Sequence, residues 1–469
     1  MKLQKFTGKS IYGIRDFNVR FKTDITFLTG INGSGKTSVL NAIVALISPL
    51  LQNLAEMDYE SIKIEFRQDS KKGFIEATKN NQLITLRSSE TDVVFEFKIF
   101  IADQDLPTSR KVEFEYEYYS DILTTNSDNP VLKFIASLPT PMFLGLDRRA
   151  RFPDGQIYRE RSWLNRSRTN RNVFSPSLSV SLRDASSLAE AKYRDVFMET
   201  TRAGDSLRRE LLLKLLAVEP ATRWGPITIP NKDALASIRE MRKHVAMLPQ
   251  ILDLKAEEVN ERISPFLDLL QKYAAEIQRD RKVHRDQDVH NVLRNRGPDD
   301  PTFSALIGWS VNISQLSRIK SISELVEIYN KNVSKIREPI IRYQNLVNKF
   351  LHDSGKSLSF DRNGNLFYTF DKDKLKEERL ISSLSSGEAQ IFVILSHLSF
   401  NPYAQSANVF IIDEPELSLH IQWQELFVES ILSANPNIQY ILATHSPSII
   451  LDKVDRCVDL TRDAFGRLA

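Results

Sequence analysis

Hydrophobic and polar residues follow different periods along the chain. The short apolar run Ile25-Thr26-Phe27-Leu28 leads into a glycine-rich loop, and a largely apolar stretch from Ser38 to Leu51 follows it. This pattern predicts a buried strand, a loop and a helix. Between Ile62 and Ile101, and again from Lys111 to Tyr119, β-branched and aromatic residues alternate with charged ones. A period of two predicts antiparallel strands with one solvated face.

The middle of the chain has a helical period. Three segments repeat apolar residues at steps of three and four among many charges: Ala185 to Leu216, Lys232 to Arg281 and Gln315 to His352. They predict a long, mainly helical insertion of coiled-coil character.

The last part of the chain returns to strand patterns. Leu358–Phe360 and Leu366–Phe370 flank Asn363-Gly364-Asn365, which predicts a hairpin. Val409–Ile412 and Tyr440–Leu442 are short apolar runs suited to a buried parallel sheet. We therefore expect an α/β fold with three parts. Residues 1–145 hold a parallel-sheet core and an antiparallel β lobe, residues 146–355 the insertion, and residues 356–469 the rest of the core.

Composition limits the binding partners and the cellular compartment that we expect. The 469 residues carry 63 Lys and Arg against 60 Asp and Glu, and this near balance argues against a protein that coats nucleic acid generally. The single cysteine, Cys457, cannot form an internal disulfide, which favours a reducing, cytoplasmic compartment. No window of about 18 uncharged apolar residues occurs, so we expect no membrane insertion.

The loop from Gly30 to Thr37 fits the phosphate-loop pattern G-x-x-x-x-G-K-[ST], between a predicted strand and a predicted helix. Its glycines let backbone N–H groups curl around phosphates, and the helix N-terminus adds its positive dipole end. Lys36 reaches the outer phosphates, and the Thr37 hydroxyl suits Mg²⁺. The residues expected to bind ATP here are Asn32, Gly33, Ser34, Gly35, Lys36, Thr37 and Ser38.

Two acidic residues, Asp413 and Glu414, directly follow the apolar run Val409–Ile412. In a doubly wound sheet such a strand end faces the ligand edge, so we expect Asp413 to hold Mg²⁺ and Glu414 to deprotonate the attacking water. Acids at a strand end are more often solvated turn residues, but here a phosphate loop accompanies them.

Two further motifs are typical of one family. Leu384-Ser-Ser-Gly-Glu-Ala-Gln390 resembles the signature loop of ABC ATPases, although alone it predicts only a helix cap. Ala443-Thr-His-Ser-Pro447 follows the next apolar run. The chain thus resembles an SMC/RecF-type ABC ATPase, and more narrowly the ATPase part of the overcoming-lysogenization-defect (OLD) nucleases, whose Asp-Glu-Pro-Glu-Leu-x-Leu-His and Thr-His-Ser-Pro strings it matches.

This resemblance covers roughly the first 145 and last 110 residues and leaves the helical middle unmatched. It implies an ABC-type ATPase head in which His445 contacts the γ-phosphate and His420 occupies the inter-subunit loop, with no role assigned. The signature residues Ser385, Ser386, Gly387 and Glu388 would contact ATP bound by a second protomer, so we expect a homodimer or a multiple of dimers. The glutamine of the family's Q-loop is not identifiable.

An arginine-rich segment lies between Asp147 and Arg171. Arginine beside aromatic residues suits phosphate contacts and base stacking, so DNA, an acidic protein or the nucleotide could be its ligand. A solvated or ion-paired face is equally compatible. The arginines are Arg148, Arg149, Arg151, Arg159, Arg161, Arg166, Arg168 and Arg171, interleaved with Phe152, Tyr158 and Trp163.

The spacing of the motifs selects among functions. A transporter ATPase subunit would carry a much shorter helical part between Lys36 and Leu384. OLD nucleases continue into a Toprim domain, whereas this chain ends soon after Pro447. We therefore expect a stand-alone ATPase, like those of the PARIS and Septu anti-phage systems, that holds or activates an effector nuclease or toxin from a neighbouring gene. A phage protein or DNA would be the trigger. A RecF/SMC-like ATPase of DNA repair or recombination is the alternative.

Overall fold

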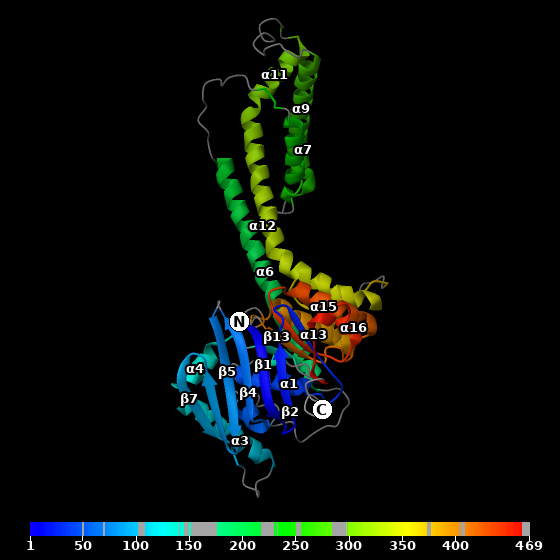
Figure 1. Cartoon of the computed structure of the whole chain (residues 1–469). Coiled ribbons are helices and arrows are strands. Elements are labelled where there is room, and N and C mark those ends of the chain that lie inside the picture. The colour runs from blue at the N-terminus through cyan, green and yellow to red at the C-terminus, as the bar shows by residue number, and fades with distance from the viewer. Residues whose placement is uncertain are drawn as a thin grey trace. The chain divides into compact units, whose positions relative to one another are not determined.

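The chain divides into two compact units in the computed structural model. One unit combines Met1–Tyr193 with Ile341–Ala469, and the other is Arg194–Ile340. The two ends of the chain therefore build one body together (Figure 1). The structure describes residues 1–48, 51–68, 71–101, 108–139, 141–144, 150–151, 176–216, 229–231, 233–249, 255–283, 297, 299–372, 377–402, 404 and 409–461.

The first unit contains a six-stranded antiparallel sheet in the order β2-β1-β4-β5-β6-β7. Along β4 a buried residue alternates with a partly exposed one, which is the pattern of a sheet with one covered face. The strands predicted between Ile62 and Ile101 are thus confirmed. The bounds are β1 Lys2–Ile11, β2 Arg15–Arg20, β4 Ser61–Gln68, β5 Lys71–Asn80, β6 Leu83–Ser88 and β7 Thr91–Lys98.

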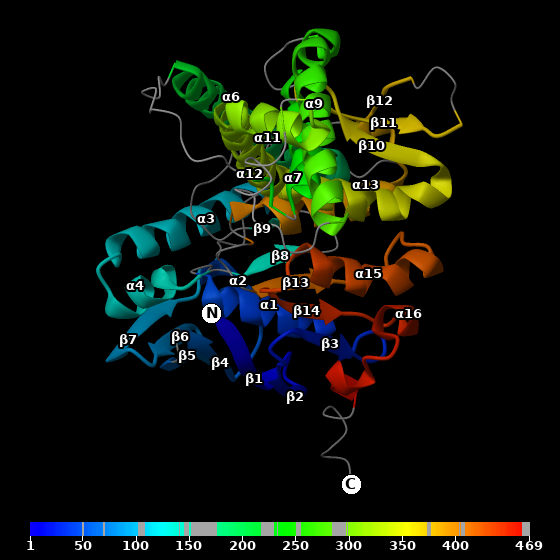
Figure 2. The ribbon, with the colours of Figure 1, turned by 90° about the horizontal axis from the view of Figure 1, so that it is seen from above.

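A second six-stranded sheet, in the order β15-β3-β14-β13-β8-β9, is parallel except for β9. All five residues of β13 and of β14 are buried, which explains why their sequences are continuous apolar runs. Helix α1 (Lys36–Ile47) packs against both sheets, and Figure 2 shows it between them. The strands are β3 Ile25–Thr29, β8 Met142–Leu144, β9 Ala150–Arg151, β13 Val409–Asp413, β14 Gln439–Ala443 and β15 Cys457–Asp459.

The strand predicted from Lys111 to Tyr119 is wrong, because this segment lies inside helix α3 (Thr108–Thr125). Tyr119 is buried and Glu115 and Ile122 are partly buried, at steps of four and three, while Phe114 and Tyr116 are exposed. The buried side of the helix therefore includes odd-numbered and even-numbered positions, whereas a strand would bury only one of these two sets. Two short helices complete this region, α2 (Leu51–Glu56) and α4 (Pro130–Ser137).

The predicted hairpin is confirmed as β10 (Lys356–Phe360) and β11 (Leu366–Phe370), and β12 (Arg379–Leu380) adds a third antiparallel strand. Asp361 accepts hydrogen bonds from the backbone of the turn, and Gly364 has a φ of +84° there. The remaining elements of this part are η1 His352–Ser354, η2 Ile381–Ser383, α13 Ser386–Phe400, α15 Ile421–Ala434, α16 Pro447–Ile450 and η3 Val454–Arg456.

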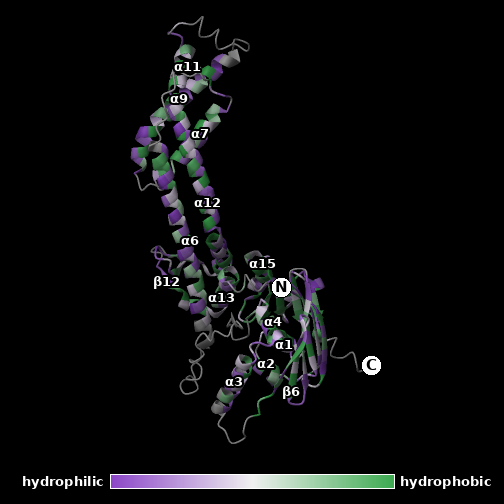
Figure 3. Cartoon of the chain, turned by 90° about the vertical axis from the view of Figure 1, so that its left-hand side faces the viewer, coloured by the Kyte–Doolittle hydropathy of each residue, from purple (hydrophilic) through white to green (hydrophobic). Residues whose placement is uncertain are grey.

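The described elements of the second unit are all helices, as its sequence period predicted. One core gathers Ile238, Leu270 and Trp309 from three helices, and another surrounds the fully buried Val326. Hydrophilic and hydrophobic residues alternate along these helices (Figure 3), which fits helices with one covered side. The helices are α7 Ala234–Val245, α9 Ala256–Val283 and α11 Pro301–Val311, with α6 Pro176–Leu216 and α12 Ile313–Leu351 shared with the first unit.

Among the helices that the structure describes, none is long and apolar enough to cross a bilayer. The arginine-rich segment falls outside the described residues except for Ala150 and Arg151 in β9. Its predicted role in ligand binding therefore stays a prediction.

Candidate active site

The phosphate loop connects the end of β3 to the start of α1. Gly30, Gly33 and Gly35 have φ angles of +145°, +79° and +95°, a region that other residues rarely occupy. A Cβ on Gly30 would lie 2.6 Å from the Ser34 Oγ, and one on Gly35 would lie 2.6 Å from the Phe17 ring. Only glycine fits this tight curve, which brings backbone N–H groups to the N-terminus of a helix, where an anion is favoured.

Lys36 is held over this loop. Its side chain is buried, and its Nζ donates to the carbonyl oxygens of Gly30 at 2.9 Å and Ile31 at 3.4 Å. Phosphate oxygens are stronger acceptors than carbonyls because they carry charge, so this ammonium is placed to bind them. Arg15, in β2, donates to the carbonyl of Gly33. Nothing in the motif pattern points to Arg15, because the contact depends on how β2 packs.

Three adjacent strand ends meet at this edge. The register of the parallel sheet pairs Asp413 with Ala443, and Ala443 with Leu28. The residues that follow these positions are therefore neighbours: Glu414 after β13, Thr444 and His445 after β14, and the phosphate loop after β3.

Thr37 and Asp413 are joined directly. The Thr37 Oγ1 donates to the Asp413 Oδ2 at 2.9 Å, and Asp413 is only 1% exposed. A hydroxyl and a carboxylate are the hard oxygen ligands that Mg²⁺ takes beside phosphate oxygens, so the pair fits this ion. When bound, Mg²⁺ would neutralise charge on the β- and γ-phosphates.

Glu414 has an unusual backbone conformation. Its φ is +45°, and its N–H donates to the carbonyl of Ala443 on the neighbouring strand at 2.9 Å. A non-glycine residue in the left-handed region costs about 1–2 kcal/mol. Strain of this kind is concentrated at functional sites, where the surrounding structure holds a side chain in one direction.

His445 is held by a carboxylate. The Oε1 of Glu416 accepts the backbone N–H of His445 at 2.9 Å and lies 2.9 Å from its Nδ1. Glu416 is 7% exposed, whereas the His445 side chain is 49% exposed. The motif string contains Glu416, but its partner His445 follows the next strand, β14, so the string does not show this contact.

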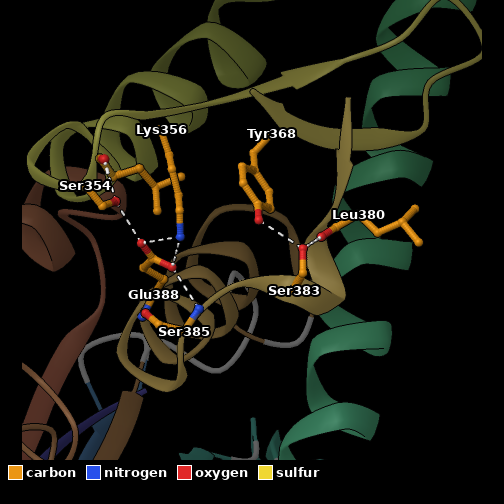
Figure 4. Close-up of polar contacts among 8 residues, drawn as sticks. Ser354, Lys356, Tyr368, Leu380, Ser383, Ser385 and Glu388 are labelled. Carbon is orange, nitrogen blue, oxygen red and sulfur yellow. Dashed lines mark hydrogen bonds and ion pairs between the residues drawn. The ribbon is translucent and has the colours of Figure 1, made fainter. Parts of the chain in front are cut away.

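The signature residues form the start of α13. Ser385 is the N-cap: its Oγ accepts the N–H of Glu388 at 3.4 Å, and its own N–H donates to the Glu388 Oε2 at 2.8 Å. The Glu388 carboxylate also accepts from Ser354 at 2.8 Å and from Lys356 at 2.8 and 3.0 Å (Figure 4). Burial raises the pKa of Glu388, but the bonds from Lys356 and the two serines outweigh it and leave the pKa below its usual range.

Both oxygens of the Glu388 carboxylate thus accept hydrogen bonds that hold the N-terminus of α13. The prediction that Glu388 contacts nucleotide stays a prediction, and so do those for Ser385, Ser386 and Gly387. Gly387 packs closely on the chain after β13, since a Cβ there would lie 2.5 Å from the carbonyl oxygen of Ser418. Among described residues, the hydrogen bonds of the cap do not reach the phosphate loop. Asn32 is exposed in that loop and Ser38 is half-buried in α1.

Part of the chain matches a known protein family. The family model AAA_21, "AAA domain, putative AbiEii toxin, Type IV TA system", matches residues 230–452, just under half of the chain. The match begins inside the helical middle, so the expectation that this part would remain unmatched was wrong. It contains the signature, strand-end carboxylate and histidine motifs but not the phosphate loop.

Two curated relatives are ATPases by name. The "Retron Vc95 probable ATPase" of Vibrio cholerae serotype O1 biovar El Tor is 32% identical over 143 residues, which are 28% of this chain and 27% of that protein. The "Retron Ec83 probable ATPase" of Escherichia coli is 23% identical over 168 residues, which are 32% and 30% of the two chains. The matched part thus spans less than a third of each relative.

Solved structures of SMC head domains align over most of the chain, but with low scores. The head domain from Pyrococcus furiosus, solved with an extended coiled coil and bound to the C-terminal domain of ScpA, covers 96% of this chain and 91% of its own, at 13% identity and a TM-score of 0.35. The one from Pyrococcus yayanosii gives 14% identity and a TM-score of 0.34.

The site and the sequence matches together support an ATPase of AAA/ABC type. Within that class, this chain is similar to the retron-associated ATPases.

Proposed function

We propose that this protein hydrolyses ATP with Mg²⁺ and uses its nucleotide state to control a separate effector in anti-phage defence. One observation carries the ATPase part of the proposal. The 2.9 Å hydrogen bond between Thr37 and Asp413 joins the phosphate loop to a strand end 376 positions later. Together with the buried Lys36, it combines a phosphate cradle and a cation site in one place.

The chain's own groups have distinct roles in this proposal. Lys36 and the loop N–H groups bind and orient the phosphates, while Thr37 and Asp413 hold the metal ion. Glu414 accepts a proton from the attacking water while the water oxygen bonds to the γ-phosphorus. The bond between the γ-phosphorus and the oxygen that leaves with ADP then breaks. His445 contacts the γ-phosphate. Ser385, Ser386 and Gly387 of a second copy complete the site, which makes the working form a homodimer or a multiple of dimers.

The control of an effector is supported by the names of the similar proteins. The matching family is described as a putative toxin of a type IV toxin–antitoxin system, and both curated relatives are retron ATPases. Among its described residues, the chain has no cluster of His, Cys, Asp or Glu that could hold a catalytic metal by itself. We therefore propose a cytoplasmic partner, a nuclease or another toxin from a neighbouring gene, released or activated when a phage protein or DNA recognises one nucleotide state.

The partner can be tested by purifying the chain together with the product of its adjacent gene. We expect a complex whose composition or nuclease activity changes when ATP and a phage lysate are added. A chain that binds no neighbouring product, and that protects cells by itself, would contradict the effector part of the proposal. DNA binding by the chain alone would favour the alternative role in repair.

Nucleotide binding by itself gives a second test. Replacing Lys36 with alanine removes charged hydrogen bonds worth about 1.5–3 kcal/mol, so we expect ATP affinity to fall roughly 10- to 100-fold. Lys331→Ala is the matched control, because Lys331 is exposed and forms an ion pair with Glu327 on its own helix. Calorimetric titration with ATP measures both variants, and equal affinities would show that Lys36 is not in the phosphate site.

A further inference from the structure

The carboxylate of Glu416 is unusually placed for a surface turn. It follows β13 by three residues, yet only 7% of the residue is exposed. Its contacts among the described residues both involve Oε1 and His445: a hydrogen bond from the backbone N–H and an ion-pair contact with the ring Nδ1, each at 2.9 Å. Its Oε2 is buried and has no hydrogen-bond partner among the described residues. Burying a carboxylate is costly, so a structure that retains one commonly has a use for its charge.

The chemistry of this contact fixes the ring of His445. An ionised carboxylate can only accept hydrogen bonds, so the ring nitrogen that faces Oε1 must carry a proton. That nitrogen is Nδ1. The other ring nitrogen, Nε2, is then the one left for a ligand, on a side chain that is 49% exposed.

A second bond network ties the same two segments together. The Ser446 Oγ donates to the Gln424 Oε1 at 2.6 Å, and the Gln424 Nε2 donates to the carbonyl of Leu419 at 2.9 Å. The turn that contains Glu416 is also braced from α13, because Gln390 donates to the carbonyl of Pro415 at 3.0 Å. Glu416 is therefore attached to a rigid support, and its carboxylate can impose an orientation on His445.

We propose that Glu416 is a positioning residue for ATP hydrolysis: it keeps Nδ1 of His445 protonated and the ring in one orientation, so that Nε2 is available to the γ-phosphate or to the attacking water. The inference rests on the proposed function, because it needs His445 to act on nucleotide. Glu416 does not touch the reacting atoms and acts only through His445.

Glu416 could instead serve only to anchor the loop that carries His445. The variant Glu416→Gln distinguishes this structural role from a role in positioning the His445 ring. The amide oxygen of glutamine still accepts the backbone N–H of His445, so the loop remains anchored. The same oxygen faces Nδ1. An amide oxygen carries no full negative charge, so it holds the proton on Nδ1 and the orientation of the ring less strongly than the carboxylate does. We expect kcat to fall roughly 10- to 100-fold while the KM for ATP changes less than about twofold. An unchanged kcat would leave Glu416 with the structural role alone.

The matched control is Glu425→Gln, which makes the same change at an exposed position on α15 and should leave both constants unchanged. The decisive comparison is Glu416→Gln in a His445→Ala background. If Glu416 acts through His445, the second substitution costs nothing further. If it slows the His445→Ala protein as much as it slows the parent, the inference is wrong.

The roles of His445 and of Glu416 are contradicted by different results. A His445→Ala protein that hydrolyses ATP at the parental rate contradicts the proposed role of His445 itself. A slow His445→Ala protein beside a fully active Glu416→Gln protein contradicts only the inference about Glu416.

A spectroscopic test needs no activity. In protein labelled with ¹⁵N-histidine, the ring signals missing from His445→Ala identify His445. We expect Nδ1 to be protonated in the parent and less completely protonated in Glu416→Gln. An unprotonated Nδ1 in the parent overturns the inference.

Discussion

Single residues at this site owe their positions to the ends of three neighbouring strands. Asp413 ends β13, and Glu414 turns away from it with a φ of +45° while its N–H stays bonded to the Ala443 carbonyl of β14. The same edge holds Thr37 against Asp413 and His445 against Glu416. The chemistry therefore depends on backbone register, which places side chains from distant parts of the sequence within hydrogen-bond distance.

One buried histidine makes stability depend on pH. His397 in α13 is 4% exposed, and burial lowers its pKa to about 4 because the charged form loses its hydration. In the unfolded chain the usual value is about 6.5, so below that pH the unfolded state binds a proton that the folded state refuses. We expect this residue alone to lower the free energy of unfolding by about 2 kcal/mol between pH 7 and pH 5.

Urea unfolding at both pH values checks this. Acidic groups also titrate in this range, so the comparison is between variants. His397→Gln should lose less stability on acidification than the parent, whereas His352→Gln, at an exposed position after α12, should behave as the parent does. The account of His397 is wrong if its variant shows the parental drop.

At the scale of elements, the start of α13 depends on residues just after α12. Lys356 and Glu388 form an ion pair at 2.8 Å with only 12% and 3% of their side chains exposed, and Ser354 adds a bond to the same carboxylate. The Lys356 ammonium also lies 5.2 Å from the ring centre of Tyr368 in β11. The hairpin and the signature helix are therefore connected through one buried charge pair (Figure 4).

Removing the cation from this pair should be costly. In Lys356→Met the Glu388 carboxylate stays buried without its cation, and breaking such a pair costs about 3–5 kcal/mol. Lys349→Met is the control, since the Lys349–Glu429 pair is exposed and worth about 0–1 kcal/mol. Chemical denaturation measures both. Equal small losses in the two variants would show that the buried pair does not hold the helix start.

Elements with a clear period could be predicted from the sequence, and those without one could not. The strands β4 to β7, the helices α6 and α12, and the β10–β11 hairpin follow their patterns. Helix α3 was misread because its buried stripe crosses an alternating pattern of glutamate and aromatic residues. The strands β8 and β15 have three residues each, too few to show any period, and exist because they extend an existing sheet.

Part of the candidate site could likewise be predicted from the sequence, and part could not. The phosphate loop and the strand-end acids are contiguous strings, and their chemistry can be read from residue types. Contacts such as Glu416 with His445, or Lys356 with Glu388, join residues about 30 positions apart. These contacts depend on how the fold packs separate segments of the chain side by side, so only the structure reveals them.

At the scale of the whole molecule, the proposal requires two copies. The signature cap is bonded to the β10–β11 side of its own chain, and none of those bonds involves its own phosphate loop. We expect Lys36→Ala and Ser385→Arg each to abolish hydrolysis alone. In an equal mixture, random pairing gives half mixed dimers with one intact site each, hence about a quarter of the parental rate.

The loss of the Ser385 cap costs about 1 kcal/mol, so thermal unfolding must first show that both variants are folded. If every mixture of folded variants stays inactive, the sites are not shared between copies.

Hydrolysis by Glu414 is the central claim, and single-turnover ATP hydrolysis by Glu414→Gln tests it most directly. Glutamine keeps the shape of the side chain but cannot take the proton from water, so we expect ATP to bind normally and its hydrolysis to slow by roughly 10²- to 10⁴-fold. Glu425→Gln, on the exposed side of α15, should hydrolyse ATP at the parental rate. A Glu414→Gln protein that converts bound ATP to ADP as fast as the parent would contradict the account.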